Sequence, residues 1–179
     1  KNYLSVDQIL LCIELARELD IQTGISFFKE DDVHDFGGRI CDFDFFKIPS
    51  VEFLNEPLIN KLFDTGKHLY LSSGAHSEEE IEYGIGCLEK QPRDRWTLMH
   101  CVSNYPLLPH NANLNYIAHL RSKYSLEVGY SSHDEMWEYC VAAITLGASV
   151  IERHFTVDRR LDGLDHSTSS DLGEFQRLA

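Results

Sequence analysis

Short apolar runs alternate with amphipathic stretches along the whole chain. Six runs are typical of β-strands because they are short and rich in β-branched and aromatic residues; they cover residues 21–28, 42–50, 68–74, 96–103, 126–132 and 149–156. Stretches of helical period separate them, and a further helix is predicted from Asp171. The helix ends carry recognisable signals, namely capping-box spacing at Ser5–Gln8 and Ser77–Glu80 and stop signals at Gly66 and Gly147.

This alternation predicts the α/β class. Strands that are apolar almost throughout and are separated by helices favour a parallel sheet covered by those helices. The strand starts are 21 to 30 residues apart, close to the roughly 30 residues per unit of a (β/α)₈ TIM barrel. An open doubly wound sheet fits the spacing almost as well. We expect one domain over residues 1–179, a partial TIM barrel with about six βα units.

Composition narrows the range of partners. With 16 Lys and Arg against 29 Asp and Glu, the net charge of −13 argues against nucleic acid or an anionic membrane as a partner. The chain has no apolar run of membrane-spanning length. Its five cysteines are scattered without a Cys-x-x-Cys pair, which indicates reduced thiols and a cytoplasmic location. Cys101, flanked by apolar strand residues, is interpreted as a packing residue.

Polar residues gather where the predicted strands end. They are Ser26, Lys47, Ser50, Ser72, Ser73, Ser103, Tyr105, Ser131, His133, Glu152 and His154. In both parallel α/β architectures, ligands bind at the carboxyl ends of the strands. Six successive strands with this feature therefore indicate a binding site at that edge.

Two of these residues could share a metal ion. His133 and His154 follow neighbouring strands, which lie about 4.8 Å apart in a sheet. Glu152 shares a face with His154, whereas Arg153 points to the opposite face. Two imidazoles with carboxylates or water suit Mn²⁺, Zn²⁺, Fe²⁺ or Co²⁺. The alternative is that each histidine only forms a hydrogen bond within its loop.

Lys47 and the serines also allow two interpretations. Lys47 could extend to the surface or pair with Asp44, or it could bind a carboxylate or phosphate. Each serine alone is typical of a turn or a helix cap. Together, their hydroxyl groups and the nearby helix N-termini favour an anionic ligand.

The same residues lie in a series of motifs that resembles a known family. The segments, in order, are FFKIPSVE, LSSGAHSEEEIE, LMHCVSNYP, VGYSSHD and GASVIERHFTVDRRLDGLDHS. From about Ile21 onward the chain is similar to the sialic acid synthases, which are phosphoenolpyruvate-dependent synthases of nine-carbon sugar acids. The resemblance implies a (β/α)₈ catalytic barrel, usually followed by an antifreeze-like domain.

The resemblance also implies an activity and a set of roles. The enzyme would be a transferase that joins phosphoenolpyruvate to N-acetylmannosamine or a related N-acetylated sugar and releases phosphate. His133 and His154 would hold a divalent metal. Mn²⁺ is the metal that we expect, and Mg²⁺ and Co²⁺ are the alternatives. Glu52 and Glu152 would act with them in catalysis, and Tyr105 and Asp165 would contact the sugar. The phosphoenolpyruvate site would consist of Ser26, Lys47, Ser50, Ser72, Ser103 and Ser131.

The chain departs from the family pattern in several places. Ser132 stands where Asp is usual, so the groups that orient His133 are expected to differ. The sequence offers no counterpart of the first two barrel strands or of the antifreeze-like domain, so we expect a fragment. The resemblance also implies a homodimer as the assembly. Synthases of legionaminic, pseudaminic or spore-coat sugar acids share the motifs. A non-catalytic remnant that retains the pocket is the alternative of another class.

Overall fold

The computed structural model describes residues 4–105, 107–163 and 165–179. A single parallel sheet runs through it in the order β1-β2-β3-β4-β5-β6. Its strands are β1 (Gly24–Ser26), β2 (Phe45–Ile48), β3 (His68–Ser72), β4 (Trp96–Cys101), β5 (Val128–Ser132) and β6 (Ile151–Arg153). All six predicted strands are present, although each is shorter than its apolar run.

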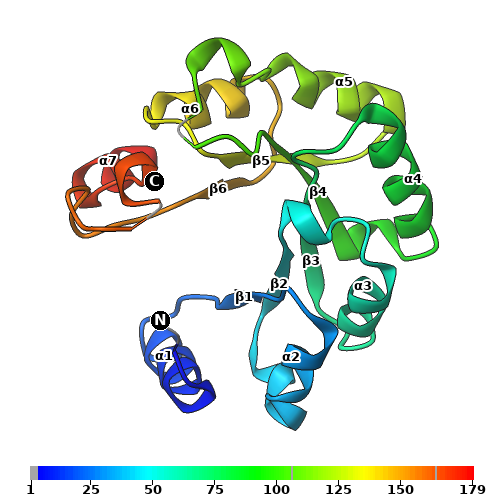
Figure 1. Cartoon of the computed structure of the whole chain (residues 1–179), viewed down its shortest axis with the longest axis vertical. Coiled ribbons are helices and arrows are strands. Elements are labelled where there is room, and N and C mark those ends of the chain that lie inside the picture. Colours follow the sequence, from blue (N-terminus) through cyan, green and yellow to red (C-terminus); the bar gives the residue numbers. More distant parts are fainter. Residues whose placement is uncertain (1–3, 106, 164) are drawn as a thin grey trace.

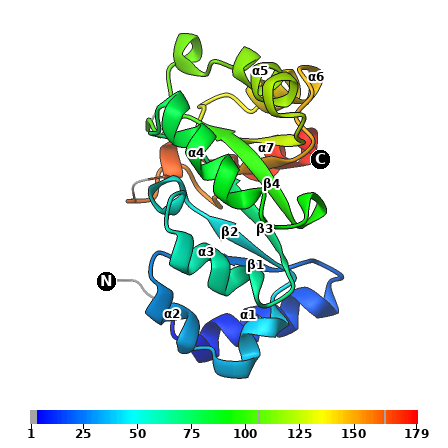
Figure 2. The ribbon, with the colours of Figure 1, turned by 90° about the vertical axis from the view of Figure 1, so that its right-hand side faces the viewer.

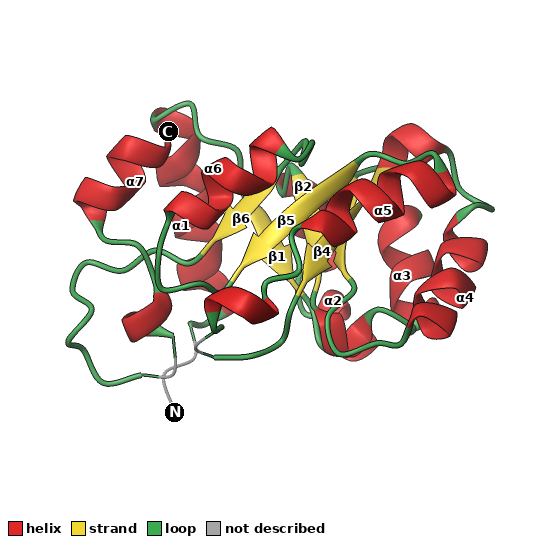
Figure 3. Ribbon diagram, turned by 90° about the horizontal axis from the view of Figure 1, so that it is seen from above, coloured by secondary structure: helices red, strands yellow, loops and turns green. Residues whose placement is uncertain are grey.

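The sheet is an incomplete barrel. The strands curve around a common interior with the helices outside, and within the described residues β1 and β6 are its two ends (Figures 1 and 3). A doubly wound sheet would reverse its strand order and carry helices on both faces. The consecutive order excludes that alternative and confirms a partial TIM barrel.

The helices are α1 (Val6–Glu18), α2 (Glu30–His34), α3 (Glu56–Phe63), α4 (Glu78–Leu88), α5 (Asn115–Tyr124), α6 (Glu138–Thr145) and α7 (Leu172–Leu178). Those that lie between two strands, α2 to α6, cover the outer face of the sheet, as Figure 2 shows from the side, whereas α1 precedes the first strand and α7 follows the last. Both predicted capping boxes are formed, and Gly66 and Gly147 have positive φ angles just beyond α3 and α6. The helix predicted from Asp171 is α7, with Asp171 as its N-cap.

The core lies between the outer face of the sheet and these helices. Leu71 and Leu98 on the strands and Leu58 and Leu120 on the helices are fully shielded from solvent. Burying side chains of this size stabilises the fold by about 1.5–3 kcal/mol each. This packing fixes the strands and leaves the inner face available for polar groups.

The strand register determines which side chains share the inner face. Lys47 pairs with Tyr70, which is two residues before Ser72, and Cys101 pairs with Ser131, which pairs with Glu152. Residues that pair across a parallel ladder, or lie two apart along a strand, point to the same side. The polar residues expected at the carboxyl edge therefore enter one interior.

Two further findings concern the described residues. Across the described ranges, no helix is both long enough and apolar enough to cross a membrane. All five cysteines are unpaired in the structure.

Candidate active site

Lys47 is the centre of a polar cluster on the inner face. Its ammonium group donates hydrogen bonds to Ser72 Oγ at 2.7 Å and to the Ile48 carbonyl at 3.1 Å. It also lies 3.3 Å from Glu152 Oε2, with a lysine side chain that is only 13% exposed. The expected alternatives for Lys47 are therefore wrong: it does not extend to the surface, and Asp44 instead accepts a hydrogen bond from the Thr23 amide.

Glu152 retains capacity for another contact. Its Oε2 atom is shielded from solvent but has no hydrogen bond of adequate geometry, so the approach to Lys47 is an ion pair without an aligned bond. A shielded carboxylate oxygen without a hydrogen-bond donor is costly and is compensated here only by charge. The side chain can therefore accept a proton or a hydrogen bond from a ligand.

A second cluster surrounds Gly74, just after β3. The Gly74 amide donates to Ser50 Oγ at 3.1 Å, and Ser50 Oγ donates to Cys101 Sγ at 3.5 Å. A Cβ atom at Gly74 would lie 2.4 Å from Ser103 Oγ and 2.8 Å from Ser50 Oγ. Only glycine allows these three loops to approach so closely, and the result is a concave group of hydroxyl, thiol and amide donors.

The expectation that Cys101 is only a packing residue is incomplete. The residue is buried, but its thiol faces Ser50 and lies 3.9 Å from His133 Nδ1. Burial raises the pKa of this thiol. The hydrogen bond to His133 and the charges of His133 and Lys47 lower it by more, so the net pKa lies below the ordinary value. The period-two relation of Cys101 to Ser103 in the sequence is the signal that could have placed it on the inner face.

His133 is oriented by two hydrogen bonds. Its Nδ1 atom is 3.0 Å from the Val102 carbonyl, which only a protonated nitrogen can satisfy, so Nε2 carries the lone pair. The Tyr105 hydroxyl, 2.8 Å away, donates to that Nε2 atom. Burial lowers the pKa of His133, but the interaction with Cys101 and the Val102 carbonyl raises it to a net value above the ordinary one.

His154 faces His133 across the edge of the sheet. Their ring centres are 5.5 Å apart, and Tyr105 lies beside both rings. Burial lowers the pKa of His154, and the charge of Asp165 only partly opposes this. Burial also raises the pKa of Tyr105 to about 12, helped by the charges of Cys101 and Asp165. The structure thus brings Tyr105 and both histidines together, and the charge of Asp165 acts on the pKa values of Tyr105 and His154.

The expected consequence of Ser132 for His133 does not arise by direct contact. The Ser132 hydroxyl lies on the opposite side of the sheet, where it donates to Asp134 Oδ2 and accepts from Arg153. His133 is oriented instead by Val102 and Tyr105. Arg153 also points away from the interior, as the alternation of the strand predicts.

Three expected site residues lie outside these clusters. Ser26 is exposed at the end of β1, where it pairs with Lys47 in the register. Ser131 is buried between Cys101 and Glu152 in the ladder. Glu52 accepts a hydrogen bond from Asn55, the N-cap of α3, at 2.6 Å. Their expected roles remain predictions.

The two histidines fit a metal ion, but they do not form a complete centre. Among the residues that the structure describes, no three His, Cys, Asp or Glu side chains group as a metal site. The Val102 carbonyl nevertheless fixes the tautomer of His133 as such carbonyls do for metal ligands. Two protein ligands would leave the other positions of an ion to water or substrate.

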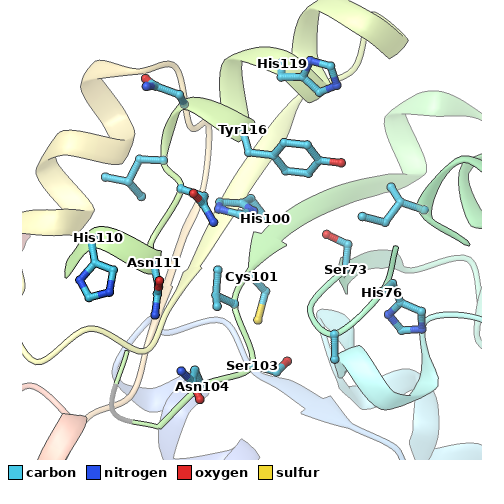
Figure 4. A pocket seen from close by; sticks show the side chains of 16 residues that line it. Ser73, His76, His100, Cys101, Ser103, Asn104, His110, Asn111, Tyr116 and His119 are labelled. Atoms are coloured by element: carbon cyan, nitrogen blue, oxygen red, sulfur yellow. The ribbon is translucent and has the colours of Figure 1, made fainter. Parts of the chain in front are cut away.

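A cavity of about 940 Å³ adjoins the clusters (Figure 4). It lies between the loops that follow β3 and β4 and the start of α5, and it shares Cys101 and Ser103 with the Gly74 cluster. Its other lining side chains include His76, His110 and Asn111, which strand-end arguments miss because His76 lies in a loop and the other two in the short 3-10 helix Pro109–Asn111.

Comparison with known proteins follows the motif resemblance. The NeuB family model matches residues 1–179. The N,N'-diacetyllegionaminic acid synthase of Campylobacter jejuni is 38% identical over 135 residues, 74% of this chain and 40% of its own length. The N-acetylneuraminate-9-phosphate synthase of Drosophila melanogaster is 32% identical over 181 residues, 99% of this chain and 48% of its own length. The chain thus spans about half or less of these relatives.

A solved structure agrees with the fold. The N-acetylneuraminic acid synthetase of Leptospira borgpetersenii superposes with a TM-score of 0.89 at 32% identity, covering 98% of this chain and 60% of that one. Motifs, fold and family model lead to the same assignment: the chain belongs to the NeuB family.

Proposed function

We propose that this chain is part of a phosphoenolpyruvate-dependent synthase that condenses phosphoenolpyruvate with N-acetylmannosamine or a related N-acetylated sugar. The observation that carries the proposal is the position of His133 and His154 beside the Lys47 cluster at the carboxyl edge of one interior. The names of the family relatives support the class of reaction.

In this proposal the Lys47 and Gly74 clusters bind phosphoenolpyruvate. A buried ammonium group with hydroxyl and amide donors suits its carboxylate and phosphate groups. Ser50, Ser72 and Ser103 would donate directly, while Ser26 and Ser131 would complete the site. Placing these donors before the reaction begins favours the anionic transition state without reorganising them.

The condensation forms one carbon–carbon bond and breaks the C2–O bond of phosphoenolpyruvate. The C2–C3 π electrons of phosphoenolpyruvate form a bond to the aldehyde carbon of the sugar, whose oxygen takes a proton. Water adds at C2 and gives up one proton; the C2 hydroxyl group then gives up the second as phosphate leaves with its bridging oxygen, which yields the 2-keto acid and hydrogen phosphate. Glu152, with its shielded oxygen, is suited to accept or deliver one of these protons. Glu52, in the short 3-10 helix that follows β2, would orient the attacking water.

His133 and His154 would hold the divalent ion, Mn²⁺ in the first instance and Mg²⁺ or Co²⁺ as alternatives. When bound, the ion would supply Lewis-acid polarisation of the sugar aldehyde. The lowered pKa of His154 favours the neutral imidazole that ligation requires, whereas the raised pKa of His133 means that an ion would have to displace a proton there. Tyr105 and Asp165, which flank the pair, would contact the hydroxyl and amide groups of the sugar.

The identity of the acceptor is a finer question. The clusters described above serve the phosphoenolpyruvate half, so a legionaminic, pseudaminic or spore-coat sugar acid synthase is the main alternative. A non-catalytic remnant that binds the same ligands is another. A cytoplasmic location and a homodimer are further proposals.

The test is phosphate release that depends on both substrates. We would measure it with this chain and with the chain completed by the segments that its relatives carry beyond it, adding Mn²⁺, phosphoenolpyruvate and N-acetylmannosamine. The expected result is release that requires both substrates and is lost in His133→Ala. A well-folded, completed protein that binds phosphoenolpyruvate without any turnover, with each sugar in turn, would favour the remnant.

A further inference from the structure

The backbone ladder between β5 and β6 stops just before the two histidines. The last paired residues are Ser132 and Arg153, and His133 and His154 each lie one residue further along. Strand pairing therefore does not by itself fix the separation of the two imidazoles. Another contact must hold the segments together beyond the ladder.

The guanidinium group of Arg153 makes such a contact directly beside both histidines, and Arg159 makes another further along, between the Ser169 and Glu135 carbonyls. The Nη1 atom of Arg153 donates to Ser132 Oγ at 2.8 Å and to the Asp134 carbonyl at 2.9 Å, so it holds the residues on both sides of His133. Its Nε atom donates to Ser170 Oγ at 2.5 Å. The Ser170 amide in turn donates to the His154 carbonyl at 2.9 Å. One side chain thus connects both histidine-bearing segments.

The partners of Arg153 are themselves held rigidly. Ser132, Asp134 and Ser170 are each at most 1% exposed. The carboxylate of Asp134 accepts hydrogen bonds from Ser132 and from Tyr130 within the sheet. Buried networks of this kind have few alternative arrangements, because breaking any bond leaves a polar group unsatisfied. The position of the guanidinium group is therefore transmitted to both segments.

We propose that Arg153 is a positioning residue for the His133–His154 pair: it sets their separation from the opposite face of the sheet without touching the ligand. The inference rests on the proposed function, because it assumes that the pair binds a divalent ion. Removing groups that orient metal ligands typically weakens metal binding about 10- to 100-fold. The planar fork of Arg153 serves four partners at once, since its Nη2 atom also donates to the Glu135 carbonyl at 3.5 Å, whereas lysine has a single nitrogen.

The test is Mn²⁺ titration calorimetry on this chain and its variants. Arg153→Met removes all the donors, and Arg153→Lys keeps the charge and reaches fewer partners. Arg95→Met is the matched control, because Arg95 is also half-buried and donates to two backbone carbonyls, those of Phe63 and Lys67. Arg95 precedes β4 and so lies at the amino ends of the strands, away from the histidine pair. Circular dichroism melting of each variant measures stability separately.

We expect Mn²⁺ binding to weaken about 10- to 100-fold in Arg153→Met and less in Arg153→Lys, with the wild-type dissociation constant in Arg95→Met. A lower melting temperature for Arg153→Met with unchanged Mn²⁺ affinity would overturn the inference while leaving the metal site intact. If Arg153→Met does not fold, unchanged affinity in Arg153→Lys overturns it. Failure of the wild type to bind Mn²⁺ would instead remove the metal site and this inference together.

Discussion

The close approach around Gly74 leads to a prediction that can be worked out from the structure. In Gly74→Ala, the new Cβ would lie 2.4 Å from Ser103 Oγ, 2.8 Å from Ser50 Oγ and 3.0 Å from Cys101 Sγ. Ser103 is exposed and can turn away, but Cys101 is buried, and Ser50 is held by the Gly74 amide. At least two of the three site groups must therefore move.

The magnitude follows from two opposing effects. Overpacking a well-packed site costs about 1–3 kcal/mol, whereas replacing glycine by alanine restricts the unfolded chain and returns about 0.4–1 kcal/mol. The net loss should be about 1–2 kcal/mol, which lowers the melting temperature by about 2–8 °C for a chain of this size. Phosphoenolpyruvate binding should weaken at least about tenfold, because a misplaced donor group costs 1.4 kcal/mol or more.

The assay combines thermal unfolding with phosphoenolpyruvate titration calorimetry. Gly86→Ala in α4 is the control, since a Cβ there meets nothing within 4 Å. Relief of the helical glycine should raise stability by about 0.5–1 kcal/mol and leave binding unchanged. If Gly74→Ala melts at the wild-type temperature and binds phosphoenolpyruvate as well as the wild type does, the concave donor group is not the anion site.

The histidine pair, the core and a buried histidine give three further predictions. Tyr105→Phe should tighten Mn²⁺ binding about two- to tenfold in calorimetry, because the hydroxyl group no longer competes for His133 Nε2 while the Val102 carbonyl still orients the ring through Nδ1; weaker binding would contradict this. Leu71→Ala should lower the free energy of unfolding by about 2–5 kcal/mol, whereas Val51→Ala, at a side chain that is 73% exposed, should stay within about 0.5 kcal/mol in the same denaturant titration. Burial lowers the pKa of His100, so the unfolded chain binds more protons, and stability should fall as the pH drops below about 6.5; an equally steep decline in His100→Asn would refute this cause.

Much of the fold could be predicted because each strand is an almost continuous apolar run. The strand lengths could not. Residues 21–28 read as one strand, but only Gly24–Ser26 pair with β2. Phe27 continues the apolar run and is buried, yet it packs in a loop against the rings of Phe36 and Phe46. A period count cannot distinguish a buried loop residue from a buried strand residue.

The candidate site shows a similar division. The polar strand ends predicted its location, because every parallel strand contributes its carboxyl end to one edge. The partner of Lys47 was out of reach, since Glu152 is 105 residues away and four strands across the sheet. The donor group around Gly74 was also missed, since no local pattern reveals three loops converging. Curvature and convergence are properties of the assembled sheet.

The contact between Lys47 and Glu152 has a consequence of its own. It joins β2 to β6, strands that share no backbone hydrogen bond, so it exists only while the sheet is bent. Flattening the sheet would separate the two charges, because β2 and β6 approach each other only across the curved interior. The charge pair therefore depends on the curvature of the barrel. We expect phosphoenolpyruvate binding to be lost on heating at a lower temperature than the secondary structure.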